Sequence, residues 1–176
     1  MLSFLIYITL FIYLLYILWI AEPLFLKRKI SAKKDNPNIS VIISARNESD
    51  NVNSLIKSLK KQTYPNNKFE VIIANDRSTD DTLNKLKELK QNFKNLKIIN
   101  IEETKINWSP KKWALNQCIE KSKGEIILQT DADCIHNETW IESMAQPFED
   151  KNIGFVAGPS YMGLKNNFVN QLLKLE

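Results

Sequence analysis

Two aspartates near the middle of the chain have the spacing of a shared cation site. Asp131 and Asp133 follow the apolar run 126–128, which is preceded by Gly124. A continuous apolar run of this kind predicts a short strand that is covered on both faces. Two carboxylates at this spacing can bind one Mg²⁺ or Mn²⁺ ion while waters and phosphate oxygens complete its coordination. Aspartates are also common in solvated turns, so the pair alone does not define a site.

Alternating strand and helix patterns predict the elements that would position this pair. Short connections between them indicate an α/β fold with a mostly parallel sheet that helices cover on both faces. Strands are expected at residues 39–44, 69–74 and 96–101, from residue 125, and at 153–157. Helices are expected from about residue 49, after a cap at Ser78 or Thr79, from Pro110, at 139–148 and at 166–176.

Acidic side chains follow three of the expected strands. Glu48 follows the first strand, Asp76 the second, and Asp131 with Asp133 the strand from residue 125. The carboxyl ends of parallel strands lie at the same edge of a sheet, where ligands of α/β proteins bind. We therefore expect these acids to converge on one site.

Four motifs at these positions together resemble a known family. The segments VIISARNE, VIIANDRSTDDT, KKWALN and GEIILQTDADC occur in this order within residues 39–134. They are similar to the donor-binding half of a family 2 glycosyltransferase with the GT-A fold, which is a Rossmann-like α/β fold. The chain contains neither the dinucleotide-binding motif G-x-G-x-x-G nor a phosphate-binding P-loop motif.

The resemblance implies roles for individual residues. Residues 45–48 would border the nucleobase, and Asp76 resembles the acid that pairs with uracil in such enzymes. Lys111 would lie near the nucleotide. Asp131 would face the ribose and the metal, and Asp133 would bind the metal directly. The residues expected to bind the nucleotide-sugar are Ala45, Asn47, Glu48, Asp76, Lys111 and Asp131, and those expected to bind Mg²⁺ or Mn²⁺ are Asp131 and Asp133.

The implied activity is an inverting sugar transfer. The donor is expected to be a nucleotide-diphosphate sugar, with a UDP-sugar favoured, and the acceptor an unknown glycan or lipid. The divalent cation would act as a Lewis acid on the departing diphosphate. A formal charge of +4 with no basic helix argues against nucleic acid as a partner.

The N-terminal segment predicts an attachment to a membrane. Residues 1–20 are free of charged side chains and long enough for a helix to cross a bilayer. A cleaved signal peptide is disfavoured because no basic segment precedes the run and no small-residue cleavage site follows it. We expect a transmembrane helix at residues 1–26 and a basic linker at 27–38. The cluster of Lys and Arg after the helix then predicts a single-pass membrane protein whose catalytic domain, residues 39–176, is cytoplasmic.

The chain departs from the family pattern at two places. Asn75 and Arg77 stand where many relatives have Asp and Gly. The acid that serves as catalytic base in such enzymes is not recognisable, and we expect it beyond Glu176. Two explanations stay open: the domain is a C-terminally incomplete piece of a longer enzyme, or it is an inactive nucleotide-binding remnant.

A haloacid-dehalogenase-type phosphatase is the third alternative. Its nucleophile motif is also an apolar strand followed by Asp-x-Asp, so Asp131 would attack phosphate and Asp133 would act as acid and base. That motif normally opens the fold, whereas three strand–helix units precede it in this chain.

Overall fold

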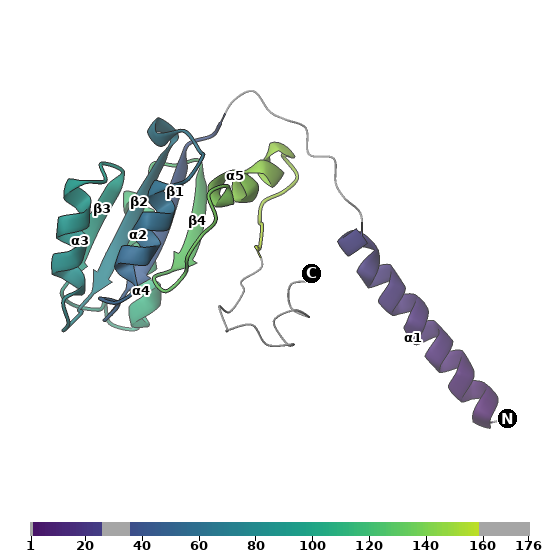
Figure 1. Cartoon of the computed structure of the whole chain (residues 1–176). Coiled ribbons are helices and arrows are strands. Elements are labelled where there is room, and N and C mark those ends of the chain that lie inside the picture. The colour runs from purple at the N-terminus through teal and green to yellow at the C-terminus, as the bar shows by residue number, and fades with distance from the viewer. Residues whose placement is uncertain (1, 26–35, 159–176) are drawn as a thin grey trace. The chain divides into compact units, whose positions relative to one another are not determined.

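The computed structural model describes residues 2–25 and 36–158 (Figure 1). The chain divides between residues 32 and 33 into two compact units, and each is described by itself. The first unit contains the helix α1 (Leu2–Phe25), and the second contains a sheet with flanking helices.

The N-terminal helix does not meet the expectation for a membrane span. Within the described part of the chain, no helix combines the length and the apolar composition that crossing a lipid bilayer requires. The predicted transmembrane helix at residues 1–26, and with it the predicted single-pass membrane location, is therefore wrong.

The second unit contains a four-stranded parallel sheet. Its strands are β1 (Ile39–Ala45), β2 (Phe69–Asp76), β3 (Leu96–Ile101) and β4 (Ile126–Asp131). They are ordered β3-β2-β1-β4, and every neighbouring pair is parallel. The expected parallel α/β sheet is confirmed. The central position of β1 and β2 explains why nearly all of their residues are buried, since each strand is covered on both faces.

Helices cover the sheet on both faces (Figure 1). The longer ones are α2 (Val52–Lys60), α3 (Thr82–Gln91) and α4 (Pro110–Lys121). Leu55 of α2 and Leu86 of α3 pack with Ile43 and Ile73 in one core, while α4 packs on the opposite face. The second core contains six buried residues: Ile42, Ile72, Ala74, Ile101, Ala114 and Cys118. Figure 1 also shows the short α5 (Trp140–Ala145), and two 3₁₀ turns span Asn66–Lys68 and Gln146–Glu149.

Three local predictions differ from the structure. The cap of α3 is Asp81, because Ser78 and Thr79 lie in the preceding loop. Helix α5 ends at Ala145, well before residue 148, because Pro147 has no N–H to continue the hydrogen-bonding pattern.

The predicted strand at residues 153–157 is also wrong. This segment pairs with no strand among the described residues, and Phe155 is 83% exposed, so it lacks the ladder that defines a strand. The predicted helix at residues 166–176 lies outside the described residues.

Candidate functional site

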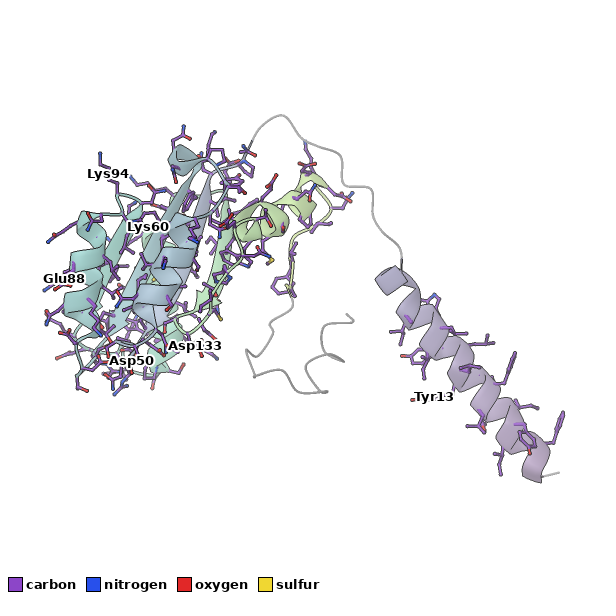
Figure 2. The ribbon with its side chains drawn as sticks, viewed as in Figure 1. Tyr13, Asp50, Lys60, Glu88, Lys94 and Asp133 are labelled. Atoms are coloured by element: carbon purple, nitrogen blue, oxygen red, sulfur yellow. The ribbon has the colours of Figure 1, made fainter. Side chains whose placement is uncertain are left out.

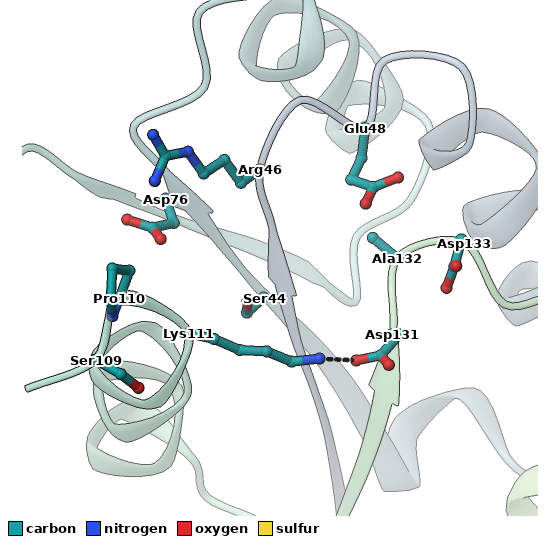
Figure 3. Close-up of a pocket in the computed structure, with 10 residues that line it drawn as sticks. All are labelled: Ser44, Arg46, Glu48, Asp76, Ser109, Pro110, Lys111, Asp131, Ala132 and Asp133. Carbon is teal, nitrogen blue, oxygen red and sulfur yellow. Dashed lines mark hydrogen bonds and ion pairs between the residues drawn. The ribbon is translucent and has the colours of Figure 1, made fainter.

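A pocket of about 470 Å³ lies at the carboxyl edge of the sheet. It is enclosed by the ends of β1, β2 and β4 and by the first turn of α4 (Figure 3). Four of its side chains are carboxylates and two are basic, so the pocket is strongly polar. Its lining residues are Ser44, Arg46, Glu48, Asp76, Ser109, Pro110, Lys111, Asp131, Ala132 and Asp133.

The strand order brings the acids of distant segments together. Strand β4 pairs with β1, and this places Asp131 opposite Ser44 in the register. Strand β2 pairs with β1 on the other side, so Asp76 ends the neighbouring strand. In Figure 3, Asp76 lies on one side of the pocket, and Asp131 and Asp133 lie on the other. The acids at the strand ends therefore line one pocket, as predicted.

Lys111 reaches across the pocket to the β4 end. Its Nζ donates a hydrogen bond to Asp131 Oδ1 at 2.7 Å (Figure 3). Pro110 occupies the first turn of α4, where a missing N–H costs nothing. Lys111 follows it and so projects from the helix start. The two side chains are 57% and 54% exposed, so water screens the pair strongly.

Asp76 is the buried acid of the pocket. It is only 3% exposed, and a buried carboxylate requires a partner. Arg77 Nε donates to Asp76 Oδ1 at 2.8 Å. The buried acid is therefore paired with its own neighbour in the chain.

A set of hydrogen bonds joins the loop after β1 to the loop after β2. The Asn47 side chain accepts a bond from Thr79 N at 2.8 Å, and Asn47 N donates to Ser78 Oγ at 3.0 Å. Glu48 N donates to Thr82 Oγ1 at 2.8 Å. Asn47 has a φ of 57°, a left-handed conformation that asparagine tolerates. The loop that carries Glu48 and the loop that follows Asp76 are thereby held in one arrangement.

Asp80 strengthens the connection between the same two loops. Its Oδ2 accepts a bond from Ser49 N at 3.1 Å. Hydrogen bonds from Thr82, with further ones from Ser49, lower the pKa of Asp80 to about 2. Asp80 is therefore a carboxylate near neutral pH, in the form that accepts these bonds.

Two of the expected binding residues do not line the pocket. Ala45 is fully buried in the core beneath the loop. The Asn47 side chain is engaged with Thr79. The other four expected residues and Asp133 do line it. The prediction did not include Ser44, Ser109, Pro110 and Ala132, and it included Arg46 only within the range 45–48 that was expected to border the nucleobase.

The carboxylates of the pocket can bind a hard divalent cation only if a bound ligand supplies further oxygen atoms to its coordination shell. In residues 2–25 and 36–158, no three His, Cys, Asp or Glu side chains are placed to hold a metal by themselves. Asp131 and Asp133 provide two carboxylates on the pocket wall. Mg²⁺ commonly binds through one or two carboxylates together with waters and substrate phosphates. The residues present therefore fit a cation that arrives with a phosphate ligand.

His136 lies close in sequence to Asp133 and contacts the core side of β4. Its ring stacks on Trp140 with centroids 3.9 Å apart, and Nε2 is 2.9 Å from Thr130 Oγ1. Burial lowers the pKa of His136 below its ordinary value. The side chain belongs to the packing beneath β4, and it is absent from the pocket lining.

A parallel sheet with an acidic pocket at its carboxyl edge is the arrangement of a ligand-binding α/β domain. The family model of glycosyl transferase family 2 matches residues 40–175, and the chain belongs to this family. This assignment decides against the phosphatase alternative.

Among curated proteins, the chain is 30% identical over 122 residues to glycosyltransferase AglE of Haloferax volcanii. It is 32% identical over 120 residues to a beta-monoglucosyldiacylglycerol synthase of Nostoc. These alignments cover 69% and 68% of the chain but only 39% and 25% of the relatives, so the chain spans less than half of either protein.

Solved structures share the fold. A crystal structure of Staphylococcus aureus TarS 1–349 in complex with UDP has a TM-score of 0.57 and 26% identity, covering 70% of this chain and 38% of that one. The mannosyltransferase PcManGT from Pyrobaculum calidifontis, in complex with GDP-Man and Mn²⁺, has a TM-score of 0.57 and 27% identity. That match covers 69% of this chain and 35% of PcManGT.

Proposed function

We propose that this domain binds a nucleotide-diphosphate sugar, with a UDP-sugar as the favoured donor, for inverting transfer to a glycan or lipid hydroxyl. The observation that carries the proposal is the pocket of about 470 Å³ that Asp76, Lys111, Asp131 and Asp133 all line. Membership of glycosyl transferase family 2 and the TarS complex with UDP support it.

The two sides of the pocket suit the two ends of a nucleotide-sugar. On one side, the buried carboxylate of Asp76 accepts a hydrogen bond from the base, and Arg46 and Glu48 border the same region. On the other side, Asp131 faces the ribose. Lys111, at the start of α4, places a positive charge where the diphosphate would lie.

Asp131 and Asp133 would hold Mg²⁺ or Mn²⁺ together with the diphosphate oxygens. When bound, the cation would stabilise the negative charge of the leaving nucleoside diphosphate. The neighbour PcManGT was solved with GDP-Man and Mn²⁺, which supports a divalent cation in a fold of this kind.

Ala45 and Asn47 would act indirectly. The small side chain of Ala45 is buried in the core at the end of β1. Asn47 joins the loop after β1 to the loop after β2 through Ser78 and Thr79. These residues would hold Glu48 and Asp76 in place without contacting the donor.

The transfer itself requires a general base that takes the proton of the acceptor hydroxyl. No acid among the described residues is assigned to this role. Donor binding is therefore the part of the function that this chain's own residues support, and transfer is proposed from the family.

Calorimetric titration of UDP into the full chain with Mn²⁺ present tests the proposal. The wild type should bind, and Asp76→Ala should bind about tenfold more weakly because it loses a buried hydrogen bond to the base. Asp81→Ala, an exposed acid at the start of α3, is the matched control and should bind like the wild type. Equal affinity for wild type and Asp76→Ala would remove Asp76 from the site. Release of UDP from a UDP-sugar would separate an active domain from a non-catalytic one.

A further inference from the structure

Asp76 and Arg77 form an unusual neighbouring pair at the end of β2. Arg77 adopts a φ of 53°, a left-handed conformation that is costly for a residue with a β-carbon. In this conformation its Nε donates to Asp76 Oδ1 at 2.8 Å. Strained backbone that persists at a ligand pocket is commonly tied to function.

Only one of the two carboxylate oxygens of Asp76 accepts a hydrogen bond from the described residues. Oδ1 accepts the bond from Arg77, whereas Oδ2 accepts none from the described residues. Asp76 is 3% exposed yet contributes to the pocket wall, so its limited contact with solvent is through the pocket. A ligand in the pocket therefore meets a carboxylate with one oxygen already engaged.

Both neighbours of Asp76 in the chain have a buried polar atom without a hydrogen-bond partner. Among the described residues, three buried side-chain atoms have no hydrogen-bond partner: Asn75 Oδ1, Arg77 Nη2 and Thr104 Oγ1. Asn75 and Arg77 flank Asp76, and Thr104 follows β3, the strand that pairs with β2. Such atoms are rare in folded proteins and call for a local explanation. In Arg77, Nε bonds to Asp76 while Nη2 of the same guanidinium group has no hydrogen-bond partner.

We propose that Arg77 is a positioning residue that sets the base preference of the pocket by holding Asp76 Oδ1. This inference rests on the proposed function, because it assumes a nucleoside diphosphate in the pocket. With Oδ1 held, Asp76 presents Oδ2 as a single acceptor. It then fits a base edge with one N–H between two carbonyl groups, which is the imide edge of uracil.

Other bases match this acceptor less well. Guanine presents two adjacent N–H donors, which a carboxylate satisfies best with both oxygens free to face the base. Cytosine has an unprotonated ring nitrogen at the equivalent position. Both this nitrogen and the carboxylate are hydrogen-bond acceptors, so no hydrogen bond forms between them. The order of affinity predicted for the wild type is UDP over GDP and CDP.

Two substitutions of Arg77 separate positioning from a general structural role. Arg77→Gly removes the bond to Asp76 and also relieves the left-handed backbone, since glycine adopts a φ of 53° without cost. This relief offsets part of the stability that is lost when buried Asp76 loses its partner, so the variant should stay folded with a modestly lower melting temperature. Arg77→Lys keeps a charged donor next to Asp76 and serves as the conservative rescue.

The experiment is calorimetric titration of UDP, GDP and CDP into the full chain with Mn²⁺, for wild type, Arg77→Gly and Arg77→Lys. In Arg77→Gly, UDP affinity should fall and the ratio of UDP to GDP affinity should drop about tenfold, the size of one hydrogen bond to a charged group. Arg77→Lys should recover part of the ratio. Thermal unfolding of each variant shows whether the fold is retained.

The outcomes distinguish this inference from the proposed function. A wild type that binds UDP, with an unchanged UDP-to-GDP ratio in Arg77→Gly, overturns the role of Arg77 and leaves the proposed function intact. Equal losses for all three nucleotides also overturn it, because they indicate a structural role alone. A wild type that binds no nucleoside diphosphate overturns the proposed function first.

Discussion

The ammonium group of Lys111 lies 2.7 Å from Asp131 Oδ1, which joins the first turn of α4 to the last residue of β4. Both side chains are more than half exposed, so the pair adds little to the stability of the fold. A weak pair is easily opened, and opening it would free Asp131 for a cation and Lys111 for a phosphate. This relationship leads to the first prediction.

Replacing Lys111 with methionine should affect metal and nucleotide in opposite directions. Lys111→Met leaves Asp131 without its cationic neighbour, so the weak binding of Mn²⁺ that two carboxylates provide without a phosphate ligand should become tighter. UDP should bind about three- to tenfold more weakly, because a positive charge beside the diphosphate is lost. Calorimetric titration of Mn²⁺ and of UDP measures both effects.

Lys112→Met is the control for that experiment. Lys112 is adjacent and exposed but does not line the pocket, so its variant should resemble the wild type in both titrations. A weaker affinity for Mn²⁺ in Lys111→Met would contradict the prediction.

Asp133→Asn should abolish the effect of metal on nucleotide binding. The substitution keeps the shape of the side chain and removes the charge that a divalent cation requires. Mn²⁺ should strengthen UDP binding to the wild type but not to the variant, as measured by titration with and without the ion. The melting temperature should not change, because Asp133 is exposed (Figure 2). Asp50→Asn, an exposed acid outside the pocket, should keep the metal effect; if Mn²⁺ has no effect on the wild type, Asp131 and Asp133 are ordinary turn residues.

Gly124→Ala should destabilise the domain. A β-carbon at Gly124 would lie 2.3 Å from Ser40 N and 2.6 Å from the carbonyl carbon of Ile39, both in the backbone of the central strand β1. Backbone atoms there cannot move aside easily, so the free energy of unfolding should fall by about 1–3 kcal/mol. Gly154→Ala is the control, because no atom lies within 4 Å of its added carbon. Equal unfolding midpoints in urea for the two variants would contradict the predicted crowding.

His136 should make the domain less stable in mild acid. Burial lowers the pKa of the folded His136 below its ordinary value of 6.5, so protonation favours the unfolded chain. The stability that neutral His136 provides is complete above pH 6.5 and is lost as the pH falls from there through the lower, folded pKa. His136→Phe preserves an aromatic ring against Trp140 but cannot titrate.

Urea unfolding of both proteins between about pH 7.5 and about pH 5.5 checks this prediction, since carboxylates titrate mainly below that window. The wild type should lose stability over this range, and His136→Phe should lose clearly less. If the free energy of unfolding changes with pH equally in the two proteins, the pKa of His136 does not differ between the folded and unfolded states, and the prediction is wrong.

Local pattern alone was enough to predict most of the regular structure. The bounds of β3 and the start of α4 were predicted to the residue. These features depend on side-chain periodicity and on proline at a helix start, which act within a few residues of the chain. The four motifs likewise indicated the family, because they are properties of short segments.

The tertiary structure decided what local pattern could not. The pairing of β4 with β1 joins residues 87 positions apart, as in Ser44 opposite Asp131, and no local periodicity specifies such a partner. The same holds for the hydrogen bond between Asn47 and Thr79, which joins the loop after β1 to the loop after β2. The strand expected at residues 153–157 failed for the converse reason: its pattern is strand-like, but a strand exists only where a neighbour supplies hydrogen bonds. The sequence by itself thus determined which segments carry the chemistry, and the long-range pairing determined which of their side chains face one pocket.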